Sequence, residues 1–213
     1  MRASPIREFG IKAVLWLPMA FFLWFLFAEA LVWPVIGMAG FALTRLWPDL
    51  FSLVSQHGHT METATRVLVN QVDAQGYGGI GELVLSQNPM IYGYSLPLFT
   101  GLAMATPLAG GRRLVQFAVA FAAIWLMQAF GVVAESLRML AFGSGEAAAA
   151  AVARTGIPAD AIALAYQFGY LILPAVTPIA LWLGLNRDFV RTLVHPVAEP
   201  AGHSPGRSPE SQE

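Results

Sequence analysis

Four long apolar stretches limit what this sequence can form. The first covers residues 13–44 with Glu29 as its only charge, and the others cover about 90–109, 114–140 and 162–185. About 20 apolar residues in a helix cross the roughly 30 Å hydrocarbon core of a bilayer. Charged residues make up 12% of the chain and the mean hydropathy is +0.59, whereas soluble domains carry about 25% charged residues. The sequence predicts an all-α integral membrane protein with four transmembrane helices.

Lys and Arg near the ends of these stretches predict the orientation. Seven flank the side that holds both termini and the turn between the second and third helices, whereas four lie on the opposite side. They are Arg2, Arg7, Lys12, Arg112, Arg113, Arg187 and Arg191 against Arg45, Arg66, Arg138 and Arg154. Because Lys and Arg accumulate in cytoplasmic segments, both termini are predicted to be cytoplasmic. Residues 1–191 then form one membrane domain, and the Pro-rich residues 192–213 form a disordered cytoplasmic tail.

Charge and cysteine content exclude several classes of protein. A formal net charge of -1 provides no positive field to attract phosphates, so no nucleic-acid partner is expected. Because the chain has no Cys, a disulfide scaffold and a cysteine nucleophile are also excluded. His57, His59 and Glu62 are metal-ligating residue types, but their spacing matches no zinc signature. Neither a metal nor another cofactor is therefore expected.

The first apolar stretch is longer than one crossing requires. At 1.5 Å per residue, residues 13–44 would span about 48 Å as a helix. Beyond the possible bend at Pro34, small and polar residues recur every three or four positions, which is typical of an amphipathic helix. Two interpretations remain open: one long tilted helix, or a crossing followed by an outer-surface helix that ends near Gln56. Cleavage as a signal peptide near Ala30 is disfavoured, because the apolar stretch continues beyond that residue.

The segment between the first two helices changes to a period of two. From Met61 to Asn70, Thr, Val and other apolar residues alternate with more polar ones, which is the pattern of a β-strand. A Gly-rich turn and a second short strand follow, so a small outward-facing β-hairpin is predicted over about residues 60–87. An Ala-rich run from Glu146 to Arg154 predicts a short helix in the second outer segment.

Unusual polar residues collect in the predicted outer half of the bundle. Gln128, Gly131, Glu135 and Arg138 recur at i, i+3, i+7 and i+10, so they share one stripe of the third helix. Lipid is a poor neighbour for Gln and Glu, so this stripe is expected to face the bundle interior or a partner. The predicted outward-facing polar pocket or partner contact comprises Glu29, Asn88, Tyr92, Tyr94, Gln128, Glu135, Arg138, Tyr166 and Gln167. No catalytic residue is assigned.

Each of these residues also has a structural interpretation. Glu135 and Arg138 can form an ion pair at the level of the lipid headgroups, where charges cost little. Gln128 can serve a hydrogen bond between helices. The tyrosines can belong to the aromatic belt at the membrane interface. The residue pattern leaves these interpretations open beside the functional ones.

Several segments together resemble a known family. They are Asn-Pro-Met-Ile-Tyr-Gly-Tyr-Ser-Leu-Pro-Leu (88–98), Gln-Ala-Phe-Gly-Val (128–132), Ala-Leu-Ala-Tyr-Gln (163–167) and the later Leu-Pro (173–174). With the Trp-Leu-Pro start at 16–18 and the predicted hairpin, the chain resembles the exosortase H-associated membrane proteins over about residues 12–191.

This resemblance implies an accessory role in the inner membrane of Gram-negative bacteria, where membrane lipid is one of the expected partners. Such proteins are encoded beside an exosortase, which recognises a C-terminal sorting signal on exported proteins at the outer face of that membrane. The leading hypothesis is a non-catalytic protein that binds the exosortase or its sorting-signal substrate there. Two alternatives stay open: a membrane-embedded enzyme that uses Glu135 and Arg138, and a small transporter.

Overall fold

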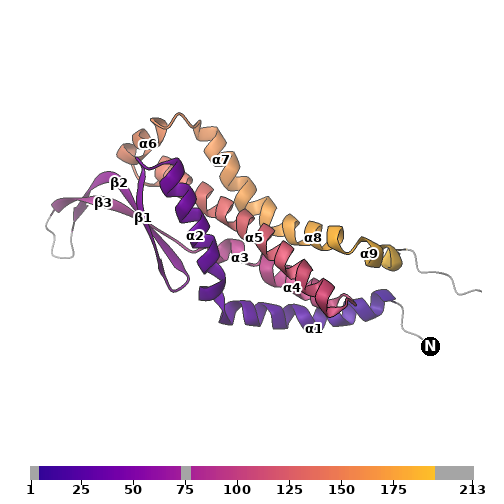
Figure 1. Cartoon of the computed structure of the whole chain (residues 1–213). Helices are drawn as coiled ribbons and strands as arrows, with labels where there is room; N and C mark the ends of the chain where they lie inside the picture. Colours follow the sequence, from indigo (N-terminus) through magenta and orange to yellow (C-terminus); the bar gives the residue numbers. More distant parts are fainter. Residues whose placement is uncertain (1–4, 73–77, 195–213) are drawn as a thin grey trace, which may run out of the picture.

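The computed structural model describes residues 5–72 and 78–194 (Figure 1). The helices are α1 (Pro5–Leu26), α2 (Ala28–Leu46), α3 (Met90–Gly93), α4 (Ser95–Ala105), α5 (Gly110–Arg138), α6 (Glu146–Ala153), α7 (Ala159–Gln167), α8 (Leu173–Leu185) and α9 (Arg187–Val194). Two π-helical segments, η1 (Met139–Gly143) and η2 (Phe168–Ile172), extend α5 and join α7 to α8. The strands are β1 (Phe51–His57), β2 (Thr60–Val72) and β3 (Gly78–Gln87).

Within the described residues, four helical segments are long and apolar enough to cross a membrane. They are α1, α2, the continuous segment Gly110–Gly143 and the segment Ala159–Leu185, while Met90–Ala105 is apolar but shorter. The predicted number of four apolar helices is therefore confirmed, but the set of helices differs. Both α1 and α2 come from the first predicted stretch, and the second predicted helix is shorter than a span. The second predicted helix, 90–109, ends at Ala105, because Thr106 precedes Pro107 and is extended.

Of the two interpretations left open for the first apolar stretch, residues 13–44, the single long helix is wrong. The stretch contains two helices that meet in a bend at Phe27 (Figure 1). The two helices pack on different partners: α1 lies against α4, whereas α2 lies against α5 and β1. The predicted outer helix also ends at Leu46, because residues 51–57 pair with β2 as a strand instead of continuing to Gln56 as a helix. Tertiary pairing here overrides the helical pattern.

The sheet has three antiparallel strands in the order β1-β2-β3. The predicted pairing of two strands within residues 60–87 is present as β2 and β3, and β1 adds a third strand. A two-residue turn joins β1 to β2 between His57 and Thr60, and its first residue, Gly58, has a φ of 61°. A non-glycine side chain would be strained at this position, so the turn needs glycine.

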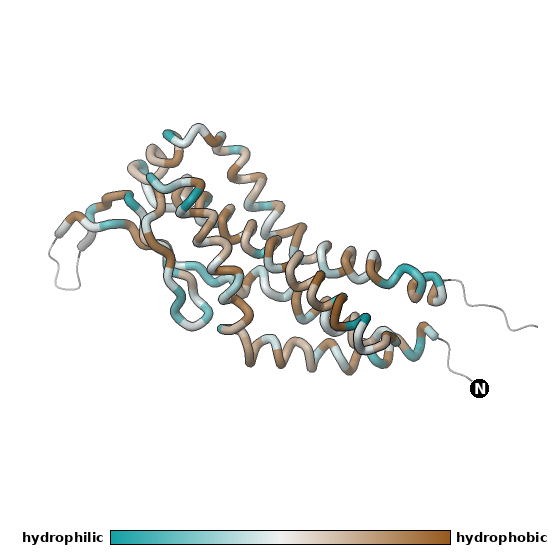
Figure 2. The backbone as a smooth tube through the Cα atoms, viewed as in Figure 1, coloured by the Kyte–Doolittle hydropathy of each residue, from teal (hydrophilic) through white to brown (hydrophobic). Residues whose placement is uncertain are grey.

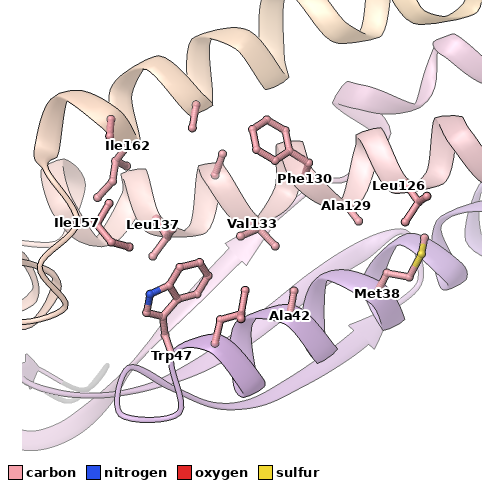
Figure 3. Close-up of a pocket in the computed structure, with 14 residues that line it drawn as sticks. Met38, Ala42, Trp47, Leu126, Ala129, Phe130, Val133, Leu137, Ile157 and Ile162 are labelled. Carbon is pink, nitrogen blue, oxygen red and sulfur yellow. The ribbon is translucent and has the colours of Figure 1, made fainter.

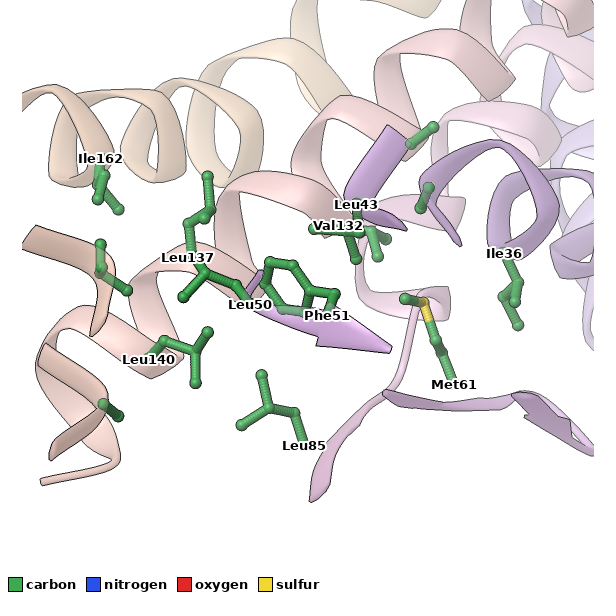
Figure 4. Packing of buried hydrophobic residues seen from close by; sticks show 14 of the residues in the cluster. Ile36, Leu43, Leu50, Phe51, Met61, Leu85, Val132, Leu137, Leu140 and Ile162 are labelled. Carbon is green, nitrogen blue, oxygen red and sulfur yellow. The ribbon is translucent and has the colours of Figure 1, made fainter. Parts of the chain in front are cut away.

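A continuous core joins the sheet to the helices. One face of the sheet packs against α2 and α5, and the cluster also includes residues of η1 and α7 (Figure 4). Its labelled members are Ile36, Leu43, Leu50, Phe51, Met61, Leu85, Val132, Leu137, Leu140 and Ile162. The sheet is therefore an integral layer of the fold. A second cluster, which includes Phe99, Ile124 and Trp182, fills the other half of the bundle.

The two ends of the described chain lie together. Pro5 and Phe9 of α1 line a small pocket with Thr192 of α9 and with Pro107 in the turn after α4. Hydrophilic residues collect at this end and at the hairpin ends, while apolar residues follow the helices between them (Figure 2). Helix α9 includes residues 192–194, so these three residues are helical and not part of a disordered tail. The rest of the predicted tail, 195–213, lies outside the described residues.

Candidate functional site

Five side chains from α3, α5, α7 and η2 form a polar cluster. We call Tyr92, Glu135, Arg138, Tyr166 and Tyr170 the tyrosine–arginine cluster. The hydroxyl of Tyr92 donates a hydrogen bond to Oε2 of Glu135. The nearest Arg138 nitrogen, Nη2, lies 3.9 Å from Oε1 of Glu135, and the guanidinium carbon lies 4.5 Å from the centre of the Tyr166 ring. Glu135 is thus held by a tyrosine on one side and a weak ion pair on the other.

The cluster depends on a close approach at Gly131. A Cβ added to Gly131 would lie 2.9 Å from Cδ1 of Tyr92, closer than carbon atoms pack. The same face of α5 lies close to Gly169 of η2, where an added Cβ would lie 3.0 Å from Cα of Gly131. Small residues let helices approach closely, as in many membrane bundles. Gly131 therefore creates the space in which Tyr92 reaches Glu135.

Helix α3 presents Tyr92 at a fixed position. The side chain of Asn88 accepts a hydrogen bond from the backbone N–H of Met90 over 3.0 Å, which satisfies a free donor at the start of the helix. Asn88 therefore stabilises the turn that leads into α3, and no contact of Asn88 with Glu135 or Arg138 is found among the described residues. Tyr94, one residue beyond α3, is half-buried.

Tyr170 is a member of the cluster that the predicted list of site residues does not contain. Its ring stacks on Tyr166 with the ring centres 5.5 Å apart, and meets the edge of Tyr92 at 6.0 Å. In a regular helix Tyr166 and Tyr170 would be one turn apart, and that spacing is the signal that could have identified the pair.

Arg138 keeps hydrogen-bonding capacity after these contacts. One third of its side-chain surface is exposed. Its Nε is buried and has no hydrogen-bond partner among the described residues. Because a guanidinium carries five N–H donors, the residue can accept a carboxylate, phosphate or backbone carbonyl from outside the chain. Glu135, only 15% exposed, is occupied by Tyr92.

The remaining predicted site residues lie apart from the cluster. Glu29 is exposed at the start of α2, where its backbone carbonyl accepts a hydrogen bond from Gln56 Nε2 over 3.1 Å. Gln167 is exposed on α7. Gln128 is 1% exposed, and its Nε2 has no partner in the part of the chain that the structure describes. The predicted pocket is therefore split, and Tyr92, Glu135, Arg138 and Tyr166 are the members that come together.

A buried polar network at the opposite end of the bundle was not predicted from the sequence. Gln116 Nε2 donates to Oδ1 of Asn186 over 3.0 Å and to the carbonyl of Leu185 over 3.1 Å. The indole N–H of Trp182 donates to Thr106 Oγ1 over 2.9 Å. These bonds tie α5 to α8, and α8 to the end of α4. The signal that could have identified it is the polar residues at the predicted inner ends of the helices, whereas the sequence analysis placed the unusual polar residues in the outer half.

An apolar cavity of about 530 Å³ lies on the other side of α5, between α2 and α7 (Figure 3). Its labelled walls are Met38, Ala42 and Trp47 on one side, Leu126, Ala129, Phe130, Val133 and Leu137 on α5, and Ile157 and Ile162 on the third side. It is separate from the tyrosine–arginine cluster, because none of the cluster residues lines it.

Comparison with known protein families gives a match over most of the chain. The family model for the exosortase H-associated membrane protein matches residues 3–189. The chain belongs to this family. The expected resemblance is thereby confirmed, and the match includes every residue of the tyrosine–arginine cluster. Comparison with curated proteins and with solved structures finds no match.

Proposed function

We propose that this membrane protein is a non-catalytic accessory component of an exosortase system in the bacterial inner membrane. On this proposal it binds the exosortase or its sorting-signal substrate at the outer face. The observation that carries the proposal is membership of the exosortase H-associated family. The chemistry of the cluster supports a binding role, because Glu135 is occupied by Tyr92 while Arg138 retains free donors.

We place four crossings at α1, α3–α4, the first part of α5, and α7–α8, and we place α2 outside the hydrocarbon. Helix α2 meets the length and hydropathy of a span. However, β1 runs beside it: Val54 packs against Gly40, and Gln56 bonds to the carbonyl of Glu29. A strand with a free edge would expose unsatisfied N–H and C=O groups to lipid, at several kcal/mol each. This cost argues for water around α2 and the sheet.

The length of α5 supports the same placement. The continuous helical segment Gly110–Gly143 has 34 residues, which is about 51 Å at 1.5 Å per residue. A hydrocarbon core of about 30 Å leaves roughly 20 Å of this helix outside the bilayer. Exposed large apolar side chains on this segment run from Leu114 to Phe130, and beyond Glu135 Phe142 is exposed as well. The tyrosine–arginine cluster then lies at the outer membrane boundary, where a partner can reach Arg138.

The chain lends itself to a direct test of this placement, because it contains no Cys. Single cysteines at Thr44 and Ser52, beside the sheet, should react in intact spheroplasts with a maleimide that cannot cross membranes. Single cysteines at Phe22 and Leu114, both exposed on the proposed lipid-facing belt, should stay unreacted until the membrane is dissolved. Protection of Thr44 and Ser52 would show that α2 lies in the bilayer or that the orientation is reversed.

Binding is tested by co-purification of the cognate exosortase with the tagged protein. The double variant Glu135→Gln and Arg138→Gln removes the charges of the cluster; the first change keeps the side-chain size, and the second shortens the side chain. Loss of a charge-assisted contact of about 1.5–3 kcal/mol should reduce recovery about tenfold or more. The matched control is Glu146→Gln with Arg154→Gln, which removes one acid and one base from the α6 region.

The outcomes separate the alternatives. Loss of the exosortase with the cluster variant, and its retention with the control, would support contact through Arg138. Retention with both would move the contact to another outer surface. The enzyme alternative predicts that the exosortase never co-purifies and that Glu135→Gln abolishes a product that the wild-type protein forms. That result would refute the accessory role.

A further inference from the structure

Strand β1 has a free edge whose backbone groups point away from the sheet. The two-residue turn makes His57 and Thr60 a hydrogen-bonded pair, so Ser55–Glu62 and Leu53–Ala64 are bonded pairs as well. Val54 and Gln56 lie between them, and their N–H and C=O groups therefore point outward. No residue within 5–72 or 78–194 hydrogen-bonds to these outward groups. An unpaired edge of this kind can template a further strand.

A groove runs along this edge. One part, of about 510 Å³, lies between β1 and α2 and is lined by Gly37, Gly40 and Phe41 with Ser52, Leu53 and Val54. The next part, of about 660 Å³, is lined by Leu26, Phe27, Glu29 and Ala30. Trp33 and Gln56 line both parts, so the two form one continuous groove.

The groove is open above Gly37, where a peptide would lie. A Cβ added to Gly37 would meet nothing within 4 Å. Trp33 and Phe41 are 70% and 67% exposed and stand on either side of Gly37. They are eight residues apart on α2, or about 12 Å, which is the length of about four residues of an extended chain.

A buried polar atom in the wall adds a second observation. Gln56 Nε2 donates to the carbonyls of Glu29 and Gly58, over 3.1 and 2.7 Å. Its Oε1 is buried and has no partner among the residues that the structure describes. A donor from a chain lying in the groove would satisfy this oxygen.

From the free edge and the groove beside it, we infer that an extended peptide segment of an exported sorting-signal protein adds to β1 as a fourth strand, over Gly37 of α2. The inference rests on the proposed function for the identity of the peptide. Main-chain hydrogen bonds give affinity in strand addition, with side-chain specificity limited to the pockets. This mode suits an accessory protein that receives many exported proteins of different sequence.

The first test is fluorescence anisotropy with labelled eight-residue peptides from the sorting region of a cognate substrate. The protein is full length, in detergent or nanodiscs. In a paired strand, only every second N–H faces β1. N-methylation of one alternating set of amides should therefore weaken binding threefold to tenfold for each bond lost. N-methylation of the other set should leave the affinity within twofold.

The second test fills the groove. Gly37→Leu places a side chain on open floor and should weaken peptide binding at least tenfold. The matched control is Gly184→Leu on α8, where an added Cβ also meets nothing within 4 Å. Both changes replace an exposed helical glycine at which an added Cβ meets nothing, so both proteins should fold, and only Gly37→Leu alters the groove.

The results separate failure of this inference from failure of the proposed function. Equal effects of the two methylation sets, no peptide binding at all, or equal binding by both glycine variants would overturn strand addition on β1. If the exosortase still co-purifies in that case, the accessory role stands without this site. Weakened self-association of Gly37→Leu without peptide binding would instead identify a second copy of the chain as the occupant and refute the inference.

Discussion

Replacement of Gly131 by Ala tests whether close packing on α5 holds the tyrosine–arginine cluster together. The added Cβ would lie 2.9 Å from Cδ1 of Tyr92, whereas ordinary contact begins near 3.4 Å. The ring must therefore move by at least the difference, 0.5 Å. Tyr92 is 1% exposed, so the ring is enclosed by other groups and moves against them. We expect the movement to pull its hydroxyl away from Glu135.

The expected magnitude follows from three contributions. Overpacking costs about 1–3 kcal/mol, and loss of a hydrogen bond to a charged group costs about 1.5–3 kcal/mol. The change from Gly to Ala inside a helix stabilises the folded state by about 1 kcal/mol, because Ala has the higher helix propensity. A net destabilisation of about 1.5–5 kcal/mol is expected for Gly131→Ala. Unfolding in detergent, followed by circular dichroism, measures this change.

A double-mutant cycle with Tyr92→Phe identifies the mechanism. Tyr92→Phe removes only the hydroxyl that bonds to Glu135. If Gly131→Ala already breaks this bond, Tyr92→Phe should cost at least about 1 kcal/mol less in the Gly131→Ala background than in the wild type. Effects that add within about 0.5 kcal/mol would refute the reasoning. A gain of stability in Gly131→Ala would do the same, because it would show that helix propensity outweighs the contact.

Two contacts elsewhere give further predictions from the same unfolding measurement. Pro178 has no N–H for the carbonyl of Pro174, and Ser95 Oγ donates to that carbonyl over 2.8 Å. Ser95→Ala should therefore cost about 1 kcal/mol in the wild type and close to nothing in a Pro178→Ala background; equal costs would refute this account. Gln116→Leu alone should cost about 1–3 kcal/mol because Oδ1 of Asn186 loses its donor, and adding Asn186→Leu should cost less than a second independent loss.

The sequence predicted the elements whose pattern is local. The alternation around Met61–Asn70 predicted strand β2, and the Ala-rich run predicted α6. The stripe from Gln128 to Arg138, expected to face the bundle interior or a partner, lies on a face of α5 on which Gln128 is buried and Glu135 meets Tyr92. In each case one helix or strand carries the information, so its period suffices.

The missed features depend on contacts between distant segments. Strand β1 forms because residues 51–57 pair with residues 60–65, although the preceding pattern is helical. Glu29 lies apart from the other candidate residues, because α2 turns away from α1 at Phe27 and packs against the sheet. The pairing of Gln116 with Asn186 joins residues 70 positions apart. No spacing along one helix indicates such a pair.

The distribution of unsatisfied polar atoms indicates which half of the molecule meets a partner. Buried polar groups are nearly always hydrogen-bonded in folded proteins. At the end that holds both termini, Gln116, Asn186 and Trp182 bond to one another or to neighbouring groups, and Nε of Arg113 is a buried atom without a partner among the described residues. At the other end, buried atoms of Gln56, Thr63, Gln87 and Arg138 have no partner among the same residues. The half that contains the sheet thus retains more unused hydrogen-bonding capacity, and recognition at that end would relieve the cost of burying it.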